Sequence, residues 1–217
     1  PTTHSTDDDP LQVLVVHCGW QSPHGALSRW EDRQAELALE IETVPRPTTD
    51  ELLEVMQRDV DVVHLAAHHE TGSGVKCADG HLQAHELSDV SAGVVVANCC
   101  GSERWARKAV DNGAAAAVAT TGPIPIKVAE RNGADLAGLL SLGWCVERAV
   151  GLLRRMYDGS GWVTVGDGAT QVTISETLAP PTCLIDTTTD TISIEWLAPN
   201  SAGRRISTII TEEPHLT

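Results

Sequence analysis

Apolar residues follow two different spacings along the chain. Short uninterrupted runs of Val, Leu, Ile and Ala are typical of strands that are covered on both faces of a sheet. Longer stretches between these runs repeat their apolar residues at helical spacing. The runs predict six strands, at 11–17, 41–44, 61–68, 93–98, 114–120 and 162–165. The helical spacing predicts five helices, at 26–40, 49–58, 103–111, 126–142 and 144–157, with Thr49 as the N-cap of the second and one or two further helical turns at 81–90.

This alternation of strand and helix is typical of a layered α/β domain with a mostly parallel sheet. The chain of 217 residues is long enough for one such domain with an appendage. We expect a disordered lead-in at 1–10, which is rich in charge, and the α/β domain at 11–174. From residue 175 the helical spacing is lost and Thr, Ile and Pro become frequent. Residues 175–217 are therefore predicted to form a β-rich extension, with strands at 191–197 and 205–211.

Charge and cysteine content limit the classes of partner and the compartment. The formal net charge is −15 and the pI is about 4.8, whereas a nucleic-acid groove or an anionic membrane surface requires a basic face on the protein. Neither is expected as a partner. The six cysteines include no CxxC pair, no apolar run is long enough to cross a bilayer, and 1–10 is not built like a signal peptide. We therefore expect a cytoplasmic protein with reduced thiols.

Reactive side chains follow two of the predicted strands. The run DVVHLAAHHE ends near His68, and the run VVVANCCGS ends in Cys99 and Cys100. About two dozen residues separate the runs, enough for a crossover between parallel neighbours, and ligands bind at the carboxyl ends of such strands. A cysteine attacks a carbonyl as its thiolate, and an imidazole favours that ion or protonates the leaving amine. The pattern indicates a cysteine–histidine site; the alternative is that both side chains are buried for packing.

The chain resembles a CHAT domain, a branch of the caspase-like cysteine peptidases, from about Leu11 to Val172. The resemblance implies a caspase-like three-layer sandwich with a mostly parallel six-stranded sheet, and it depends on the shared order and spacing of several segments. These are LQVLVV, TTDELLEVMQRDVDVVHLAAHH, ADGHLQAHEL, VVVANCCGS, NGAAAAVATTG, LLSLGWCVERAVGLLRRMY and GWVTVGDGAT.

The resemblance also implies roles for single residues. The family's paired histidines, four residues apart, fall on His64 and His68; the second is the catalytic one, and His64 is interpreted as a core residue. The nucleophile directly after the strand is predicted to be Cys99, with Cys100 as the alternative. The backbone N–H groups of His69 and Cys99 would bind the oxyanion.

Two positions depart from the family's pattern. His69 stands where the family usually has Gly, so a side chain occupies a place that prefers none. Ser102 only approximately matches the Ser or Thr that usually follows the cysteine. These departures keep a catalytically silent adaptor as an alternative to the peptidase.

The substrate pocket is predicted to lack charge. Metacaspase-like enzymes that cleave after Arg or Lys carry an acid two residues before the nucleophile, and that residue is Ala97 here. The expected pocket wall, Thr121, Pro123 and Ile124, brings no charge before Lys127. Because a buried unpaired charge is costly in such surroundings, we expect a small or aliphatic residue before the scissile bond.

The resemblance implies a protein substrate and a regulated setting, such as bacterial antiviral defence or cell death. We expect a separate regulatory or sensor protein, bound through 175–217, and no cofactor or metal. A different class of function is a zinc-binding module. Cys77, His81 and His85 have the spacing C-x3-H-x3-H and are residue types that bind zinc. No oligomeric state is predicted.

Overall fold

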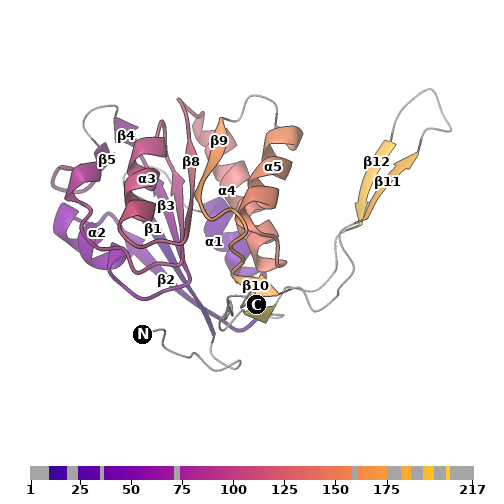
Figure 1. Ribbon diagram of the computed structural model, residues 1–217, viewed down its shortest axis with the longest axis horizontal. Helices are drawn as coiled ribbons and strands as arrows, with labels where there is room; N and C mark the ends of the chain where they lie inside the picture. The colour runs from indigo at the N-terminus through magenta and orange to yellow at the C-terminus, as the bar shows by residue number, and fades with distance from the viewer. Residues whose placement is uncertain are drawn as a thin grey trace, which may run out of the picture.

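The computed structural model describes residues 10–18, 24–34, 37–70, 74–157 and 161–174, and three further strands at Thr182–Asp186, Ser193–Leu197 and Arg204–Arg205. A six-stranded sheet runs through the α/β domain in the order β2-β1-β3-β7-β8-β9 (Figure 1). Its strands are β1 (Leu11–Cys18), β2 (Leu39–Pro45), β3 (Val62–Ala67), β7 (Val94–Asn98), β8 (Ala116–Thr120) and β9 (Trp162–Gly166). Neighbouring strands are parallel, except that β9 is antiparallel to β8. The predicted α/β class and the mostly parallel six-stranded sheet are confirmed.

Helices cover both faces of this sheet and make three layers (Figure 1). One face is covered by α2 (Thr49–Met56) and α3 (Glu103–Asp111), and the other by α1 (His24–Glu31), α4 (Ile126–Ser141) and α5 (Val146–Met156). We call them the α2–α3 face and the α4 face. Trp105 of α3 is fully buried in the first core, and Trp30 of α1 is fully buried in the second.

The pleat divides each central strand between the two cores. In β3, Val63 and Leu65 pack on the α2–α3 face, whereas Val62 packs on the α4 face. In β7, Val95 packs on the α2–α3 face and Val96 packs on the α4 face. Both sets are apolar because both faces are covered, which explains why these strands appear in the sequence as uninterrupted apolar runs.

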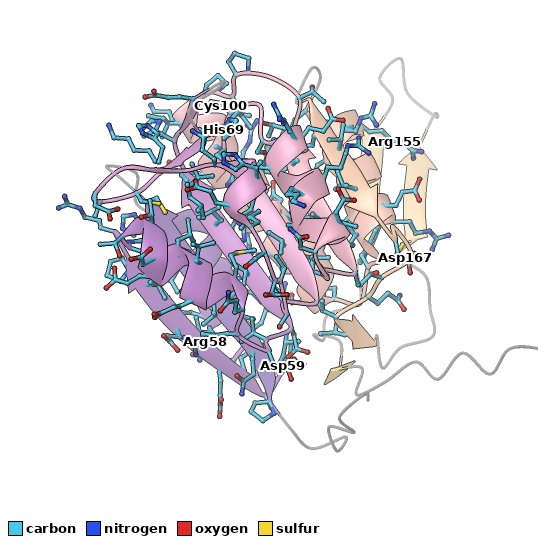
Figure 2. All side chains as sticks on the ribbon, turned by 60° about the vertical axis from the view of Figure 1, so that its left-hand side comes forward. Arg58, Asp59, His69, Cys100, Arg155 and Asp167 are labelled. Atoms are coloured by element: carbon cyan, nitrogen blue, oxygen red, sulfur yellow. The ribbon has the colours of Figure 1, made fainter. Side chains whose placement is uncertain are left out.

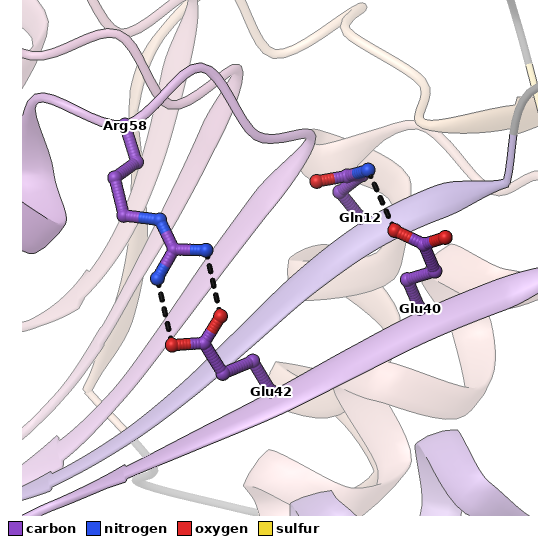
Figure 3. Close-up of polar contacts among 4 residues, drawn as sticks. All are labelled: Gln12, Glu40, Glu42 and Arg58. Atoms are coloured by element: carbon purple, nitrogen blue, oxygen red, sulfur yellow. Dashed lines mark hydrogen bonds and ion pairs between the residues drawn. The ribbon is translucent and has the colours of Figure 1, made fainter.

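The edge strand β2 carries charged side chains. Arg58 donates two hydrogen bonds to the carboxylate of Glu42, of 2.7 and 2.6 Å, and Gln12 on β1 donates one of 2.8 Å to Glu40 (Figure 3). The Arg58 guanidinium lowers the pKa of Glu42. Charge on an edge strand discourages pairing with other chains, and an exposed ion pair of this kind adds at most about 1 kcal/mol to stability.

Two local predictions at the helices were wrong. The helix expected at 26–40 ends at Glu31, and from Leu39 the side chains mostly alternate between half-buried and exposed, the period of a strand. The N-cap of α2 is Thr48 instead of Thr49. Thr48 forms a capping box with Glu51, in which the Thr48 N–H donates to the carboxylate at 2.7 Å.

A small antiparallel sheet follows β3, where the sequence predicted no strand. It consists of β4 (His69–Glu70), β5 (Gly74–Lys76) and β6 (His81–Leu82), and we call it the flap. The helical turns expected at 81–90 are limited to one 3₁₀ turn at Ala84–Glu86. Strands of two or three residues are too short to show a period in the sequence.

The C-terminal extension takes part in two short antiparallel pairs, one of them with the end of the α/β domain. Strand β10 (Thr173–Ile174) pairs with β13 (Arg204–Arg205), and β11 (Thr182–Asp186) pairs with β12 (Ser193–Leu197). Strand β12 overlaps the one predicted at 191–197; residues 206–211 of the other predicted strand and the lead-in at 1–9 lie outside the described residues. The division at 174–175 stays a prediction. Within the described residues, no helix is long and apolar enough to cross a membrane.

The approach of α4 to the sheet requires a glycine. An ideal Cβ on Gly133 would lie 2.6 Å from Nδ2 of Asn98 and 3.1 Å from Nε2 of His64, both beneath the helix. We predict that Gly133→Ala lowers the free energy of unfolding by about 1–3 kcal/mol through overpacking.

The matched control for this substitution is Gly151→Ala in α5, where an added Cβ meets no atom within 4 Å. This change should be neutral or raise stability by up to about 1 kcal/mol, since Ala favours helix. Urea unfolding of the two variants beside wild type measures both effects. Equal effects would show that α4 does not approach the sheet as closely as described.

Candidate active site

The register between β3 and β7 determines which residues meet at the carboxyl edge of the sheet. The two strands are parallel and pair Leu65 with Ala97 and Ala66 with Asn98. Just beyond these pairs, β3 leads to His68, and β7 leads through a turn to Cys99 and Cys100. The histidine and cysteine segments singled out in the sequence are therefore brought together at adjacent strand ends, where α/β sheets bind their ligands.

Cys99 lies inside the protein. It packs in the α2–α3 core, and its side chain is 1% exposed. Burial raises the pKa of its thiol to about 12, although a hydrogen bond with Ser102 acts in the opposite direction. The N–H of Cys99 donates to the carbonyl of Ala97 at 2.9 Å. Cys99 is thus a protonated core thiol at neutral pH, and its amide already has an acceptor within the protein.

Cys100 lies in the turn that follows β7 and is half-buried. Its Sγ accepts a hydrogen bond of 3.4 Å from the N–H of Ile124 and lies 3.8 Å from the carbonyl of the same residue. Ile124, predicted from the sequence as part of the pocket wall, therefore contacts the thiol of Cys100; the predicted nucleophile was Cys99.

His69 connects the histidine segment to the cysteine segment. Its Nδ1 lies 2.7 Å from the carbonyl oxygen of Cys100, so the ring donates from this nitrogen. Figure 2 shows the two residues close together at one end of the molecule. The His69 side chain is thus hydrogen-bonded to the segment that follows the neighbouring strand.

The turn after Cys99 is fixed from the neighbouring strand β8. Thr120 donates from its hydroxyl to the carbonyl of Cys99 at 2.6 Å and accepts from the N–H of Gly101 at 3.0 Å. Gly101 has a φ of 57°, a left-handed conformation that favours glycine. Ser102 donates to Ala97 O at 2.7 Å and accepts from Thr120 N at 3.1 Å. The sequence placed Thr120 at the start of the expected pocket wall but did not indicate its role in this turn; its position at the end of a predicted neighbouring strand was the available signal.

The other predicted pocket residues are dispersed. Ala97 is fully buried on the α2–α3 face, away from the face on which Asn98 lies. Thr121 and Pro123 are exposed in the segment that leads to Ile124. Among these positions, the structure places Ile124 directly at a cysteine of the site.

His64 is a core residue, as expected. It is 1% exposed, and burial lowers its pKa to about 4. Within the described residues neither of its ring nitrogens has a hydrogen-bond partner. His64 is therefore neutral and lies beneath α4.

The residues of the zinc hypothesis do not converge. Cys77 is buried in the α2–α3 core, His81 pairs with Glu70 at 3.6 Å, and His85 is exposed. In the described parts of the chain, no three His, Cys, Asp or Glu side chains are grouped so that they could hold a metal ion.

Comparison with solved structures identifies the fold of the chain. Searches against protein-family models and against curated proteins gave no match. Among solved structures, the Arg-specific cysteine proteinase gingipain R (RgpB) matches with a TM-score of 0.59 at 11% identity, over 77% of this chain. The fold is caspase-like. The chain covers 49% of the gingipain chain, so it spans about half of that protein's length.

The caspase-like fold agrees with the position of the site. Its mixed sheet, with five parallel strands and an antiparallel β9, brings the ends of β3 and β7 to one edge, and these ends carry His68 and Cys100. At 11% identity the likeness shows the fold alone, so the roles of single residues stay predictions.

The burial of His64 makes stability depend on pH. Its pKa is about 4 in the folded protein and 6.5 ordinarily, so the unfolded chain takes up the proton first as pH falls. The contribution of neutral His64 to the free energy of unfolding is fully present above about pH 6.5. It is lost progressively as the pH falls towards 4, by roughly 3 kcal/mol in total. In His64→Leu this part of the pH dependence should disappear.

Urea unfolding at pH 5.0 and 7.5 checks the effect. The control is His85→Gln, which replaces an exposed histidine and should keep the wild-type difference between the two pH values. The same pH difference in His64→Leu as in wild type would contradict the burial of a neutral His64.

Proposed function

We propose that the chain is a CHAT-like cysteine endopeptidase in which His68 and Cys100 form the catalytic dyad. One observation carries the proposal: the parallel strands β3 and β7 are adjacent and end at one edge of a caspase-like sheet, where the chain continues into His68 and into the half-buried thiol of Cys100. Sequence reasoning favoured Cys99. Its burial and high pKa favour Cys100 instead, because the thiolate is the attacking species.

In the proposed reaction, the Cys100 thiolate attacks the carbonyl carbon of a peptide bond. The electron pair of the carbonyl moves to its oxygen, and the backbone N–H groups of His69 and Cys100 stabilise this oxyanion. The C–N bond breaks as the His68 imidazolium protonates the departing amine. Water then hydrolyses the thioester, releases the acid and restores the thiol.

The choice of oxyanion donors follows the choice of nucleophile. The sequence predicted the backbone N–H groups of His69 and Cys99 as oxyanion donors. The N–H of Cys99, however, donates a hydrogen bond to the carbonyl of Ala97. Moving the nucleophile by one residue moves the second donor to Cys100. The hydrogen bond from the His69 ring to the Cys100 carbonyl supports this arrangement, because it fixes the two segments against each other.

The setting is proposed from the resemblance. Likeness to CHAT domains suggests a protein substrate, a separate regulatory or sensor protein, and a role in defence or cell death. The proposed cytoplasmic location rests on the cysteine content, and the proposed binding of the regulator through residues 175–217 rests on the strands of that segment. The antiparallel pairs of the extension support it as a binding element, since exposed strand edges accept further strands.

Substitution of the two neighbouring cysteines tests the dyad. Cys100→Ala should lower kcat/KM on a cleaved library peptide by more than about 10³-fold, because nucleophile and base act as a unit. Cys99→Ala should keep most of the activity and melt a few degrees lower, because it leaves a cavity in the core. His68→Ala should be inactive with a melting temperature near that of wild type.

Activity lost in Cys99→Ala and kept in Cys100→Ala would overturn the assignment of the nucleophile. A wild-type chain that cleaves no peptide or protein would instead favour the silent adaptor. His64→Ala is the control for the histidine, because it should lower stability and leave the chemistry in place.

The residue before the scissile bond is proposed to be uncharged. With Cys100 as nucleophile, the position two residues before it is Asn98, and with Cys99 it is Ala97, so neither choice supplies an acid. Ile124 contacts the thiol from an apolar segment. Burying a charged side chain there would leave it unpaired at a cost of several kcal/mol.

Profiling with a peptide library that varies this one position measures the preference. Cleavage after Leu, Met or Ala should exceed cleavage after Arg, Lys or Asp by at least about tenfold. Strong cleavage after a charged residue, with no cleavage after Leu, would contradict the proposed preference for an uncharged residue. The variant Lys127→Ala is informative, since loss of cleavage after Asp in it alone would show that Lys127 reaches the pocket.

A further inference from the structure

Two peptide groups flank the proposed nucleophile, and side chains of neighbouring elements hold both of them. The first joins Cys99 to Cys100, and its carbonyl oxygen accepts the Thr120 hydroxyl at 2.6 Å. The second joins Cys100 to Gly101. Its carbonyl oxygen accepts from Nδ1 of His69 at 2.7 Å, and its N–H donates to the Thr120 hydroxyl oxygen at 3.0 Å. The orientation of both peptides is therefore fixed from outside the turn.

The N–H of Cys100 is the remaining polar group of these two peptides. Within the described residues, no backbone carbonyl accepts a hydrogen bond from it. Peptide groups are planar, and the described chain contains no cis peptide, so the N–H of the first peptide points opposite to its carbonyl. That carbonyl points to Thr120 on β8, and β7 lies between β8 and β3. The N–H of Cys100 is therefore directed towards the β3 side, from which His68 and His69 come.

The backbone of His69 faces away from its partner strand in the flap. His69 lies opposite Val75, and Lys76 donates its N–H to the carbonyl of His68 at 2.9 Å. This bond makes His69 and Val75 a non-hydrogen-bonded pair of the antiparallel ladder, so the N–H of His69 points away from β5. Both N–H groups proposed as oxyanion donors are thus left unused by the ladders of their own segments.

We propose that Thr120 is a positioning residue, whose hydroxyl aims the Cys100 N–H at the oxyanion of the substrate. This inference rests on the proposed peptidase function, in which that N–H is one of two donors. An oxyanion donor must lie about 3 Å from the oxygen on which the charge develops. Without the Thr120 hydroxyl, the Cys99 carbonyl loses its hydrogen bond and the peptide group can turn. The donor is then lost while the thiol of Cys100 stays in place.

The Thr120 side chain is itself held by the core. Thr120 is 1% exposed, and its N–H donates to Oγ of Ser102 at 3.1 Å. Ser102 is fully buried and donates to the carbonyl of Ala97 at 2.7 Å. This network connects the ends of β7 and β8, so the hydroxyl of Thr120 keeps its place beside the Cys99 carbonyl.

Steady-state kinetics on a cleaved library peptide separate this role from a structural one. Thr120→Val should lower kcat by about 30-fold and change KM by less than about threefold, because the lost contact forms only as charge develops on the substrate oxygen. Thr120→Ser retains a hydroxyl and should restore kcat to within about threefold of wild type.

The matched control is Thr173→Val. The Thr173 hydroxyl is also buried and donates to a backbone carbonyl, that of Leu140, at 2.8 Å. It belongs to β10, which lies at the opposite end of the molecule from the flap (Figure 1). Both Val variants should melt lower than wild type, since each loses a buried hydrogen bond, but only Thr120→Val should lose kcat. Wild-type kcat in Thr120→Val, or equal losses in the two Val variants, would overturn the proposal.

A peptide aldehyde that ends in leucinal provides a measurement without turnover. Its carbonyl carbon bonds reversibly to Sγ of Cys100, the electron pair of the C=O bond moves to the oxygen, and the adduct protects the thiol from iodoacetamide. Fragmentation of the peptide that carries Cys99 and Cys100 locates the alkyl group. The aldehyde concentration for half protection should be at least about tenfold higher in Thr120→Val and near the wild-type value in Thr120→Ser. Without aldehyde, Cys100 should be alkylated at the same rate in all three proteins, because iodoacetamide forms no oxyanion.

Equal protection in wild type and Thr120→Val would overturn the proposal, as would slower alkylation of the free Cys100 thiol in Thr120→Val. An aldehyde that does not protect wild type would overturn it as well. The proposed function fails separately. A wild type that cleaves no peptide, yet is protected by the aldehyde only when residue 120 carries a hydroxyl, would refute the peptidase and leave this inference standing.

Discussion

The parallel pairing of β3 with β7 is the constraint on which the candidate site depends. The side chains of a strand alternate with a period of two, so the register and the pleat together decide which residues at the strand ends share a face. Ala66 lies opposite Asn98, and the chain reaches His68 and the two cysteines directly after these paired ends.

Two cysteines that are adjacent in sequence thereby acquire opposite properties. Cys99 lies among buried side chains of the α2–α3 core, where an unpaired thiolate would be poorly solvated, and its pKa is high for that reason. Cys100 lies at the edge of the sheet, contacts Ile124 and is joined to His69 through its carbonyl. Thr120 on β8 holds the turn between them. The chemistry of the site thus follows from how the backbone is held.

Much of this arrangement could be predicted from the sequence, because long apolar runs covered on two faces leave a strong signal. The six strands, the burial of His64 and the meeting of the two strand ends follow from such runs. The flap could not be predicted, since strands of two or three residues show no period. The choice between Cys99 and Cys100 depends on the turn that follows β7, whose conformation a pattern of apolar residues does not determine.

A crystal structure of the chain with a peptidyl ketone inhibitor that alkylates active-site thiols tests the central claim most directly. An inhibitor with Leu before the ketone carries the uncharged residue proposed for the pocket. The account predicts a thioether on Sγ of Cys100, with the His68 ring within hydrogen-bonding distance of the reacted group and Cys99 unmodified in the core. A thioether on Cys99, or one on Cys100 with the His68 ring turned away, would contradict it.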